Sequence, residues 1–86
     1  MNTNDIRVTA LRLLSNIAPE ADPAALKPDI SFRDQLDIDS VDLLNFLISL
    51  HKEFSVEIPE RDYDKLMTVN SCVAYLEKAI AGKSGS

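Results

Sequence analysis

Apolar residues recur at intervals of three and four along most of this sequence, which is the period of an α-helix. No segment shows the sustained alternation of apolar and polar residues that a half-buried β-strand requires. The only glycines, Gly82 and Gly85, lie at the end of the chain, so glycine interrupts none of the periodic segments. The pattern therefore predicts an all-α fold.

Four segments with this period predict three long helices and one short one. Thr3 or Asn4 is suited to cap the first helix, and Thr68 is suited to cap the last. Asp39 or Ser40 is suited to cap the second helix, which has too many apolar residues for one narrow stripe and should be the most buried. The expected helices span about residues 4–18, 40–54, 60–66 and 69–81.

The connection between the first two helices, at about residues 19–39, contains three of the four prolines. Loops of this length in compact domains are usually functional, disordered or partly folded on themselves, and the apolar residues in this one indicate that it is pinned to the core. We therefore expect one domain at residues 1–81, an up-and-down four-helix bundle with a long first loop. Residues 82–86 should form a flexible tail.

The charge of the chain is concentrated in its middle. The formal net charge is −5, and residues 28–66 contain ten acids and only four bases. This charge argues against nucleic-acid binding, which depends on Lys and Arg neutralising phosphates. An acidic middle indicates partners with basic surfaces, although a surface that only keeps the protein in solution is the alternative.

The sequence contains none of the usual signals for a membrane or an oxidising compartment. No apolar run reaches the ~20 residues of a membrane span, and residues 1–7 lack the apolar core of a secretory signal. The single cysteine, Cys72, excludes an intrachain disulfide. We therefore expect no stable membrane insertion and place the chain, as a monomer, in the reducing cytoplasm.

No pattern of an active site or metal centre is present. The segment from Asp37 superficially resembles a calcium-binding EF-hand loop, but it lacks the required residues at the fifth, sixth and twelfth positions. His51, the only histidine, has no neighbouring nucleophile or base in sequence and should be a solvated surface residue. Cys72 lies on the apolar face of the last helix and should be a small core residue. We expect neither an enzyme nor a metal site.

The triplet Asp39-Ser40-Val41 stands where the long loop meets the second expected helix. Downstream, Glu53-Phe54-Ser55-Val56-Glu57-Ile58-Pro59 and Lys65-Leu66-Met67-Thr68-Val69 follow at fixed distances. Together these segments resemble the attachment motif of the acyl carrier protein family, in which a long loop ends in Asp-Ser-Leu. The resemblance covers about residues 30–80.

The resemblance implies that a phosphopantetheinyl transferase attaches a 4'-phosphopantetheine arm from coenzyme A to Ser40, between Asp39 and Val41. The first turn of a helix exposes the serine hydroxyl, and the helix N-terminus favours the anionic phosphodiester. The terminal thiol of the arm, rather than that of Cys72, would hold an acyl group as a thioester. The alternative for Ser40 is an ordinary N-cap.

The resemblance also implies docking of the second helix on basic patches of enzymes that load and transfer acyl groups. Asn45 stands where a glutamate is usual, and His51-Lys52 interrupts a run that is commonly acidic, which indicates a specialised carrier with restricted partners. Neutral drift on a solvated helix face is the alternative. The expected partner-contacting residues are Asp42, Asn45, Lys52 and Glu53.

Part of the core should open to sheath the acyl chain, since each buried methylene contributes ~0.8 kcal/mol. Tyr63 occupies a position that is often small in the family and would restrict this pocket. The expected pocket residues are Phe32, Leu36, Leu44, Leu47, Leu50, Ile58, Tyr63, Leu66 and Cys72.

The prediction is therefore an acyl carrier of lipid or related metabolism. Asp39 directly before the serine resembles acyl carriers more than peptidyl carriers. A carrier for an amino or aryl acid is one alternative, and an unmodified helical interaction module of the same fold is another.

Overall fold

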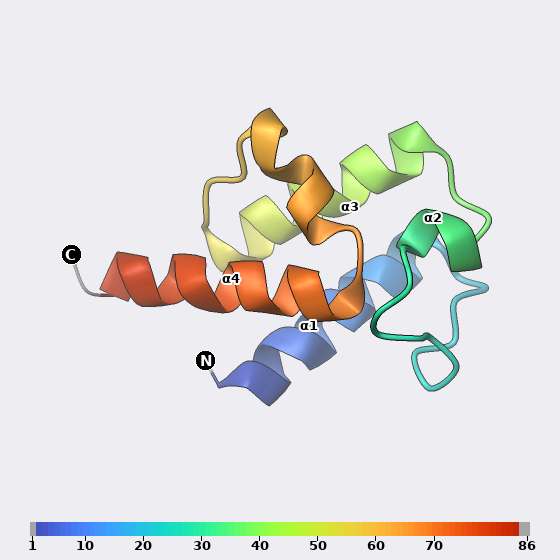
Figure 1. The fold of residues 1–86 in the computed structure, drawn as a ribbon, viewed down its shortest axis with the longest axis horizontal. Coiled ribbons are helices and arrows are strands. Elements are labelled where there is room, and N and C mark those ends of the chain that lie inside the picture. Colours follow the sequence, from blue (N-terminus) through green and yellow to red (C-terminus); the bar gives the residue numbers. More distant parts are fainter. Residues whose placement is uncertain (1, 85–86) are drawn as a thin grey trace.

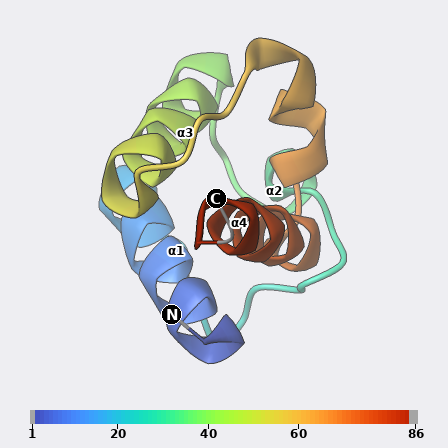
Figure 2. The same cartoon turned by 90° about the vertical axis from the view of Figure 1, so that its left-hand side faces the viewer.

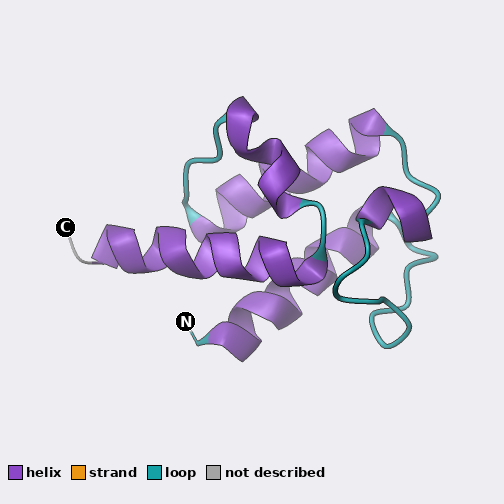
Figure 3. Cartoon of the chain, viewed as in Figure 1, coloured by secondary structure: helices purple, strands orange, loops and turns teal. Residues whose placement is uncertain are grey.

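The structure, a computed structural model, describes residues 2–84 and contains helices but no strand in that range (Figure 3). The all-α prediction is confirmed, and four of the helices have seven or more residues. The four main helices are α1, α3, the short 3-10 helix η1 and α4, and they run in alternating directions (Figure 1). η1 leads the chain from the end of α3 back to the start of α4. In order the helices are α1 (Thr3–Ile17), α2 (Phe32–Gln35), α3 (Ser40–Phe54), η1 (Glu60–Leu66) and α4 (Val69–Ser84).

Two details of the helices differ from the prediction. The long connection contains the one-turn helix α2, which is too short for a periodic pattern to show. The last helix continues beyond residue 81 to Ser84 and includes Gly82, since one glycine costs a helix only about 1 kcal/mol relative to alanine. Gly85 and Ser86, the rest of the expected tail, lie outside the described residues.

Polar side chains define where the long helices begin. The carboxylate of Asp39 accepts a 2.9 Å hydrogen bond from the backbone N–H of Asp42, so Asp39 is the N-cap of α3. Thr68 and Ser71 exchange backbone-to-side-chain hydrogen bonds at the start of α4. The cap of α1 is Asn2, one residue before the predicted pair. Each cap of this kind stabilises the fold by ~1 kcal/mol.

The core lies between the three long helices. Figure 2 shows α4 end-on, with α1 and α3 on one side and η1 and α2 on the other. Phe32 of α2 is fully buried and meets Phe46 of α3 edge-to-face, with 5.5 Å between the ring centroids. The backbone N–H of Phe32 also donates to the carbonyl of Met67, at the junction of η1 and α4. The expectation that the long connection is pinned to the core is confirmed.

Candidate functional site

Ser40 is the first residue of α3 and is exposed. Because Asp39 caps the helix, the alternative that Ser40 is an ordinary N-cap is wrong. Within the described residues, neither the Ser40 hydroxyl nor the backbone N–H groups of Ser40 and Val41 have a hydrogen-bond partner. The helix N-terminus therefore offers a free nucleophilic hydroxyl beside unpaired N–H groups, a setting that suits a phosphodiester on this side chain.

The outer face of α3 is apolar rather than acidic. Val41, Leu44 and Ile48 are 64%, 42% and 40% exposed, and their spacing of three and four places them in one stripe along the helix. Asn45 and Lys52 are exposed on the same face. We call this set of five residues the outer stripe of α3. It accounts for the excess of apolar residues in α3 that the core does not bury.

The acids predicted to contact partners flank the outer stripe. Asp42, two residues from Ser40, is half-buried, with its backbone held by the Asp39 cap. Glu53 lies toward α1, where its carboxylate is 3.5 Å from the guanidinium of Arg12. Both members of this pair are substantially exposed, so the pair adds little to stability. The structure therefore places Asn45 and Lys52 on the same face of α3, two turns apart, whereas Glu53 lies toward α1.

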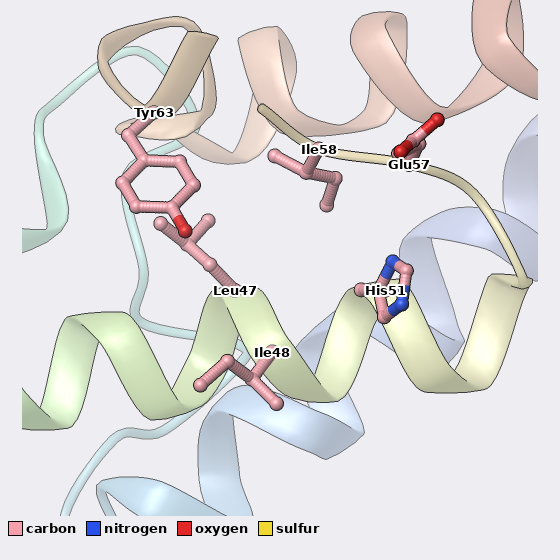
Figure 4. Close-up of a pocket in the computed structure, with 6 residues that line it drawn as sticks. All are labelled: Leu47, Ile48, His51, Glu57, Ile58 and Tyr63. Atoms are coloured by element: carbon pink, nitrogen blue, oxygen red, sulfur yellow. The ribbon is translucent and has the colours of Figure 1, made fainter. Parts of the chain in front are cut away.

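A cleft of about 220 Å³ lies between α3 and the segment from Glu57 to η1 (Figure 4). Its apolar part is formed by the side chains of Leu47, Ile48 and Ile58, and its polar part by those of His51, Glu57 and Tyr63. Tyr63 extends from η1 over Leu47, whereas His51 and Glu57 lie on opposite sides of the other end, farther along α3 from Ser40 (Figure 4). The cleft therefore has one end near Ser40 that is mainly apolar and a far end that is polar.

The predicted acyl pocket and this cleft share only Leu47, Ile58 and Tyr63. Four other predicted pocket residues are fully buried in the core. Leu36 is partly buried and packs against the core, and Leu44 belongs to the outer stripe. The spacing of apolar residues indicates which side chains are buried, but not which buried ones border a void. The four fully buried side chains are Phe32, Leu50, Leu66 and Cys72.

Sequence reasoning missed three residues of the cleft: Ile48, His51 and Glu57. His51 is exposed as expected, but one ring nitrogen, Nδ1, lies 2.7 Å from the carbonyl oxygen of Val56 and holds the turn that follows α3. That turn requires Ser55 in the left-handed region, at φ 54°. The position of His51, one turn before the predicted end of α3, is the only signal in the sequence that could have placed it near Glu57.

Two contacts meet at the Asp62 carboxylate of η1, one from α4 and one from within η1. The Tyr75 hydroxyl donates a 2.7 Å hydrogen bond to the carboxylate of Asp62, and the Lys65 ammonium lies 3.2 Å from the same carboxylate. The hydrogen bond from Tyr75, followed by that from Lys65, lowers the pKa of Asp62 below its ordinary value. Burial, followed by the bond to Asp62, raises the pKa of Tyr75 to about 12.

Cys72 has the core position that its place on α4 predicted. Its side chain is fully buried, and burial raises the pKa of the thiol to about 12. Since the thiolate is the reactive form, this thiol is inert at neutral pH. Within residues 2–84 no three His, Cys, Asp or Glu side chains gather closely enough to hold a metal ion. No helix in that range is long and apolar enough to cross a membrane.

Comparison with known proteins identifies the family. Residues 9–76 match the family described as "Phosphopantetheine attachment site". The chain is 42% identical over 57 residues to the acyl carrier protein of Bdellovibrio bacteriovorus, a match that covers 66% of this chain and 73% of the relative. It is 28% identical over 74 residues to a putative mitochondrial acyl carrier protein of Schizosaccharomyces pombe, covering 86% of this chain and 66% of that one.

The fold has a solved counterpart as well. A structure of the acyl carrier protein from Enterococcus faecalis superposes with a TM-score of 0.78, covering 92% of this chain and 99% of the other. The two sequences are 24% identical, so this likeness supports the fold alone. Members of the family are carriers that depend on a phosphopantetheinyl transferase and on partner enzymes. The chain belongs to the phosphopantetheine-binding family and has the function of an acyl carrier protein that works through a covalent 4'-phosphopantetheine group.

Proposed function

We propose that Ser40 is the residue to which the phosphopantetheine arm is attached. The observation that carries this proposal is the division of roles at the start of α3, where Asp39 caps the helix and leaves the Ser40 hydroxyl exposed and unpaired among the described residues. The N–H groups of Ser40 and Val41 are oriented by the same helix end toward an anion on that hydroxyl. When attached, the arm supplies a terminal thiol that holds the acyl group as a thioester.

We further propose that the cleft between α3 and η1 receives the acyl chain. Leu47 is seven residues from Ser40 along α3, which at 1.5 Å per residue is about 10 Å. The cleft therefore begins within reach of an arm on Ser40 and continues away from it toward His51 and Glu57. Its apolar walls favour methylene groups, each of which gains ~0.8 kcal/mol on leaving water.

Partner enzymes are proposed to dock around Ser40 and along the outer stripe of α3. The carboxylates of Asp39 and Asp42 beside Ser40 attract a basic patch at this end. From Val41 onward, Leu44 and Ile48 continue an apolar surface, and Lys52 at its far end repels a partner that is basic there. This combination supports a carrier with restricted partners, as Asn45 and Lys52 predicted from the sequence. The monomeric state and the cytoplasmic location stay predictions, and one relative is mitochondrial.

Intact-protein mass spectrometry tests the attachment site. The chain is incubated with coenzyme A, Mg²⁺ and a broad-specificity phosphopantetheinyl transferase, and the mass should rise by one phosphopantetheinyl group. Ser40→Ala should abolish the increase while leaving the melting temperature nearly unchanged, because the hydroxyl makes no contact that the fold needs. Ser49→Ala, which also removes a serine from α3, is the matched control and should accept the arm. An arm on the Ser40→Ala protein would refute the assignment.

A further inference from the structure

The two ends of the outer stripe of α3 differ in charge. The carboxylates of Asp39 and Asp42 lie at the end near Ser40, and neither forms an ion pair within residues 2–84. Lys52 lies at the other end, ten residues beyond Asp42, which is about 15 Å along α3. Exposed charges this far apart are largely screened from each other at physiological salt. A partner that covers the stripe therefore meets a negative end and a positive end as separate features.

Lys52 is an unpaired cation in the described part of the chain. Its ammonium has no ion pair and no side-chain hydrogen bond within residues 2–84, although an acid follows it directly in sequence. That acid, Glu53, has its carboxylate 3.5 Å from the guanidinium of Arg12 on α1 instead. Lys52 is exposed beyond Ile48, where the apolar part of the stripe ends. The fold therefore leaves the charge of Lys52 without a counter-charge beside an apolar surface.

A partner that covers the stripe affects Lys52 as well as the apolar residues. Val41, Leu44 and Ile48 gain free energy when they leave water. The same contact removes water from the neighbouring ammonium, which costs free energy unless a group of the partner replaces that water. A carboxylate replaces it best, because a hydrogen bond between charged groups is about twice as strong as one between neutral groups. A basic side chain at the same place repels Lys52.

We propose that the enzymes that accept this carrier present an acidic side chain opposite Lys52. Their docking surface is then basic near Ser40, apolar along Leu44 and Ile48, and acidic at the far end. Two ends of opposite charge fix the direction in which α3 lies on the partner. The inference rests on the proposed docking along the outer stripe and deepens it by naming the chemistry of the partner. The alternative is that the flexible side chain of Lys52 turns its ammonium away into water, which would make docking indifferent to the charge there.

Two synthetic helical peptides of identical composition test the proposal on the full chain before the arm is attached, so the result does not depend on attachment at Ser40. Both peptides carry arginines at one end and a stripe of leucines along one face. In the last turn of the first peptide, glutamates lie on the leucine face and arginines on the opposite face, and in the second peptide they are exchanged. Fluorescence anisotropy of the labelled peptides measures Kd at low salt.

We expect the peptide with glutamates on the leucine face to bind about fivefold more tightly, because an attraction to Lys52 replaces a repulsion. Since the two peptides have the same net charge, the difference reports only the charge that faces Lys52. It should shrink at high salt, where exposed charges are screened.

Variants then locate the preference. Lys52→Gln should remove it and Lys52→Glu should reverse it, whereas Lys78→Glu, which changes an exposed lysine of α4, should preserve it. Leu44→Ala should weaken both peptides to the same extent, because it removes apolar contact and leaves the charges in place. Equal binding of the two peptides by the wild type, or a preference that survives Lys52→Gln, overturns the proposal. Indifference of both peptides to Leu44→Ala would refute docking along the outer stripe itself, and the proposal with it.

Discussion

Tyr75 and Asp62 join α4 to the helix that forms one wall of the cleft. The hydroxyl of Tyr75 donates to Asp62 Oδ2 at 2.7 Å, and Lys65 Nζ lies 3.2 Å from Oδ1 of the same carboxylate. η1 carries Tyr63, so this contact holds the segment that borders the cleft. The contact also lowers the pKa of Asp62 and, together with burial, raises that of Tyr75.

Removing this hydrogen bond should have an effect that depends on pH. Tyr75→Phe should lower the melting temperature at neutral pH. The contribution of Asp62 is present above the ordinary carboxyl pKa of 3.8 and is lost as pH falls through the lower folded value. The contribution of Tyr75 is present below its ordinary pKa of 10.0 and is lost as pH rises toward about 12.

The difference in melting temperature between wild type and Tyr75→Phe should therefore be largest between these limits and shrink beyond both. Circular dichroism melts across the pH range measure it. Tyr63→Phe is the control, because the Tyr63 hydroxyl has no partner among the described residues, and it should behave as wild type. A difference that stayed constant from acid to alkaline pH would mean that the Asp62 carboxylate does not contribute.

The thiol of Cys72 should not react in assays that detect the terminal thiol of the attached arm. Its thiol is fully buried, and its pKa is raised to about 12, so a disulfide reagent at pH 8 should not react with the folded chain before attachment. After attachment one thiol per chain should react rapidly. A colorimetric thiol titration with and without denaturant measures both. Rapid reaction of the folded, unmodified chain would show that the core around Cys72 opens readily.

Two leucines predicted for the same pocket should differ sharply in their effect on stability. Leu66 is fully buried, so Leu66→Ala should lower the free energy of unfolding by about 2–5 kcal/mol. Leu44 is 42% exposed on the outer stripe, so Leu44→Ala should change it by about 0.5 kcal/mol or less. Urea denaturation measures both variants. Similar losses would mean that Leu44 is buried in solution, for example against a second molecule.

The helices were predictable because each long one carries its own local signals. The boundaries of α3 follow from Asp39 as a cap before an apolar run, and those of η1 from Pro59 before it. α2 was not predictable from periodicity, because four residues do not complete a period that can be distinguished from chance. Its position depends on Phe32 packing against Phe46, a contact between residues far apart in sequence.

The candidate site also has a part that was predictable from the sequence and a part that was not. Ser40 lies within a motif of consecutive residues, which can be recognised in the sequence alone. The cleft is formed between α3 and a segment ten residues farther along the chain, and it depends on which side of α3 that segment covers. Leu44 and Leu47 are both apolar residues of one helix, yet only Leu47 faces the cleft. Periodicity alone does not separate an exposed apolar stripe from a buried one when a helix is apolar on more than half of its surface.

The outer stripe of α3 should determine which partner enzymes accept this carrier. Asn45 and Lys52 are exposed on the same face of α3. Asn45 lies between the apolar residues Val41 and Ile48, and Lys52 lies beyond Ile48. A partner with a basic patch along this face gains no attraction from Asn45 and is repelled by Lys52. Asn45→Glu/Lys52→Glu should therefore raise kcat/KM for such enzymes by about tenfold at low salt, mainly through faster association. The gain should shrink at high salt, where exposed charges are screened.

The comparison uses acyl-loading and elongation enzymes that serve general carriers, with wild type and double variant both carrying the arm. Asn16→Glu/Lys78→Glu makes the same change of charge on α1 and α4, away from the outer stripe, and is the matched control. It should leave kcat/KM close to wild type, because net charge alone does not align the two proteins. If the control gained as much as the α3 variant, the effect would come from total charge. If the wild type already matched a general carrier, the outer stripe would impose no restriction on partners.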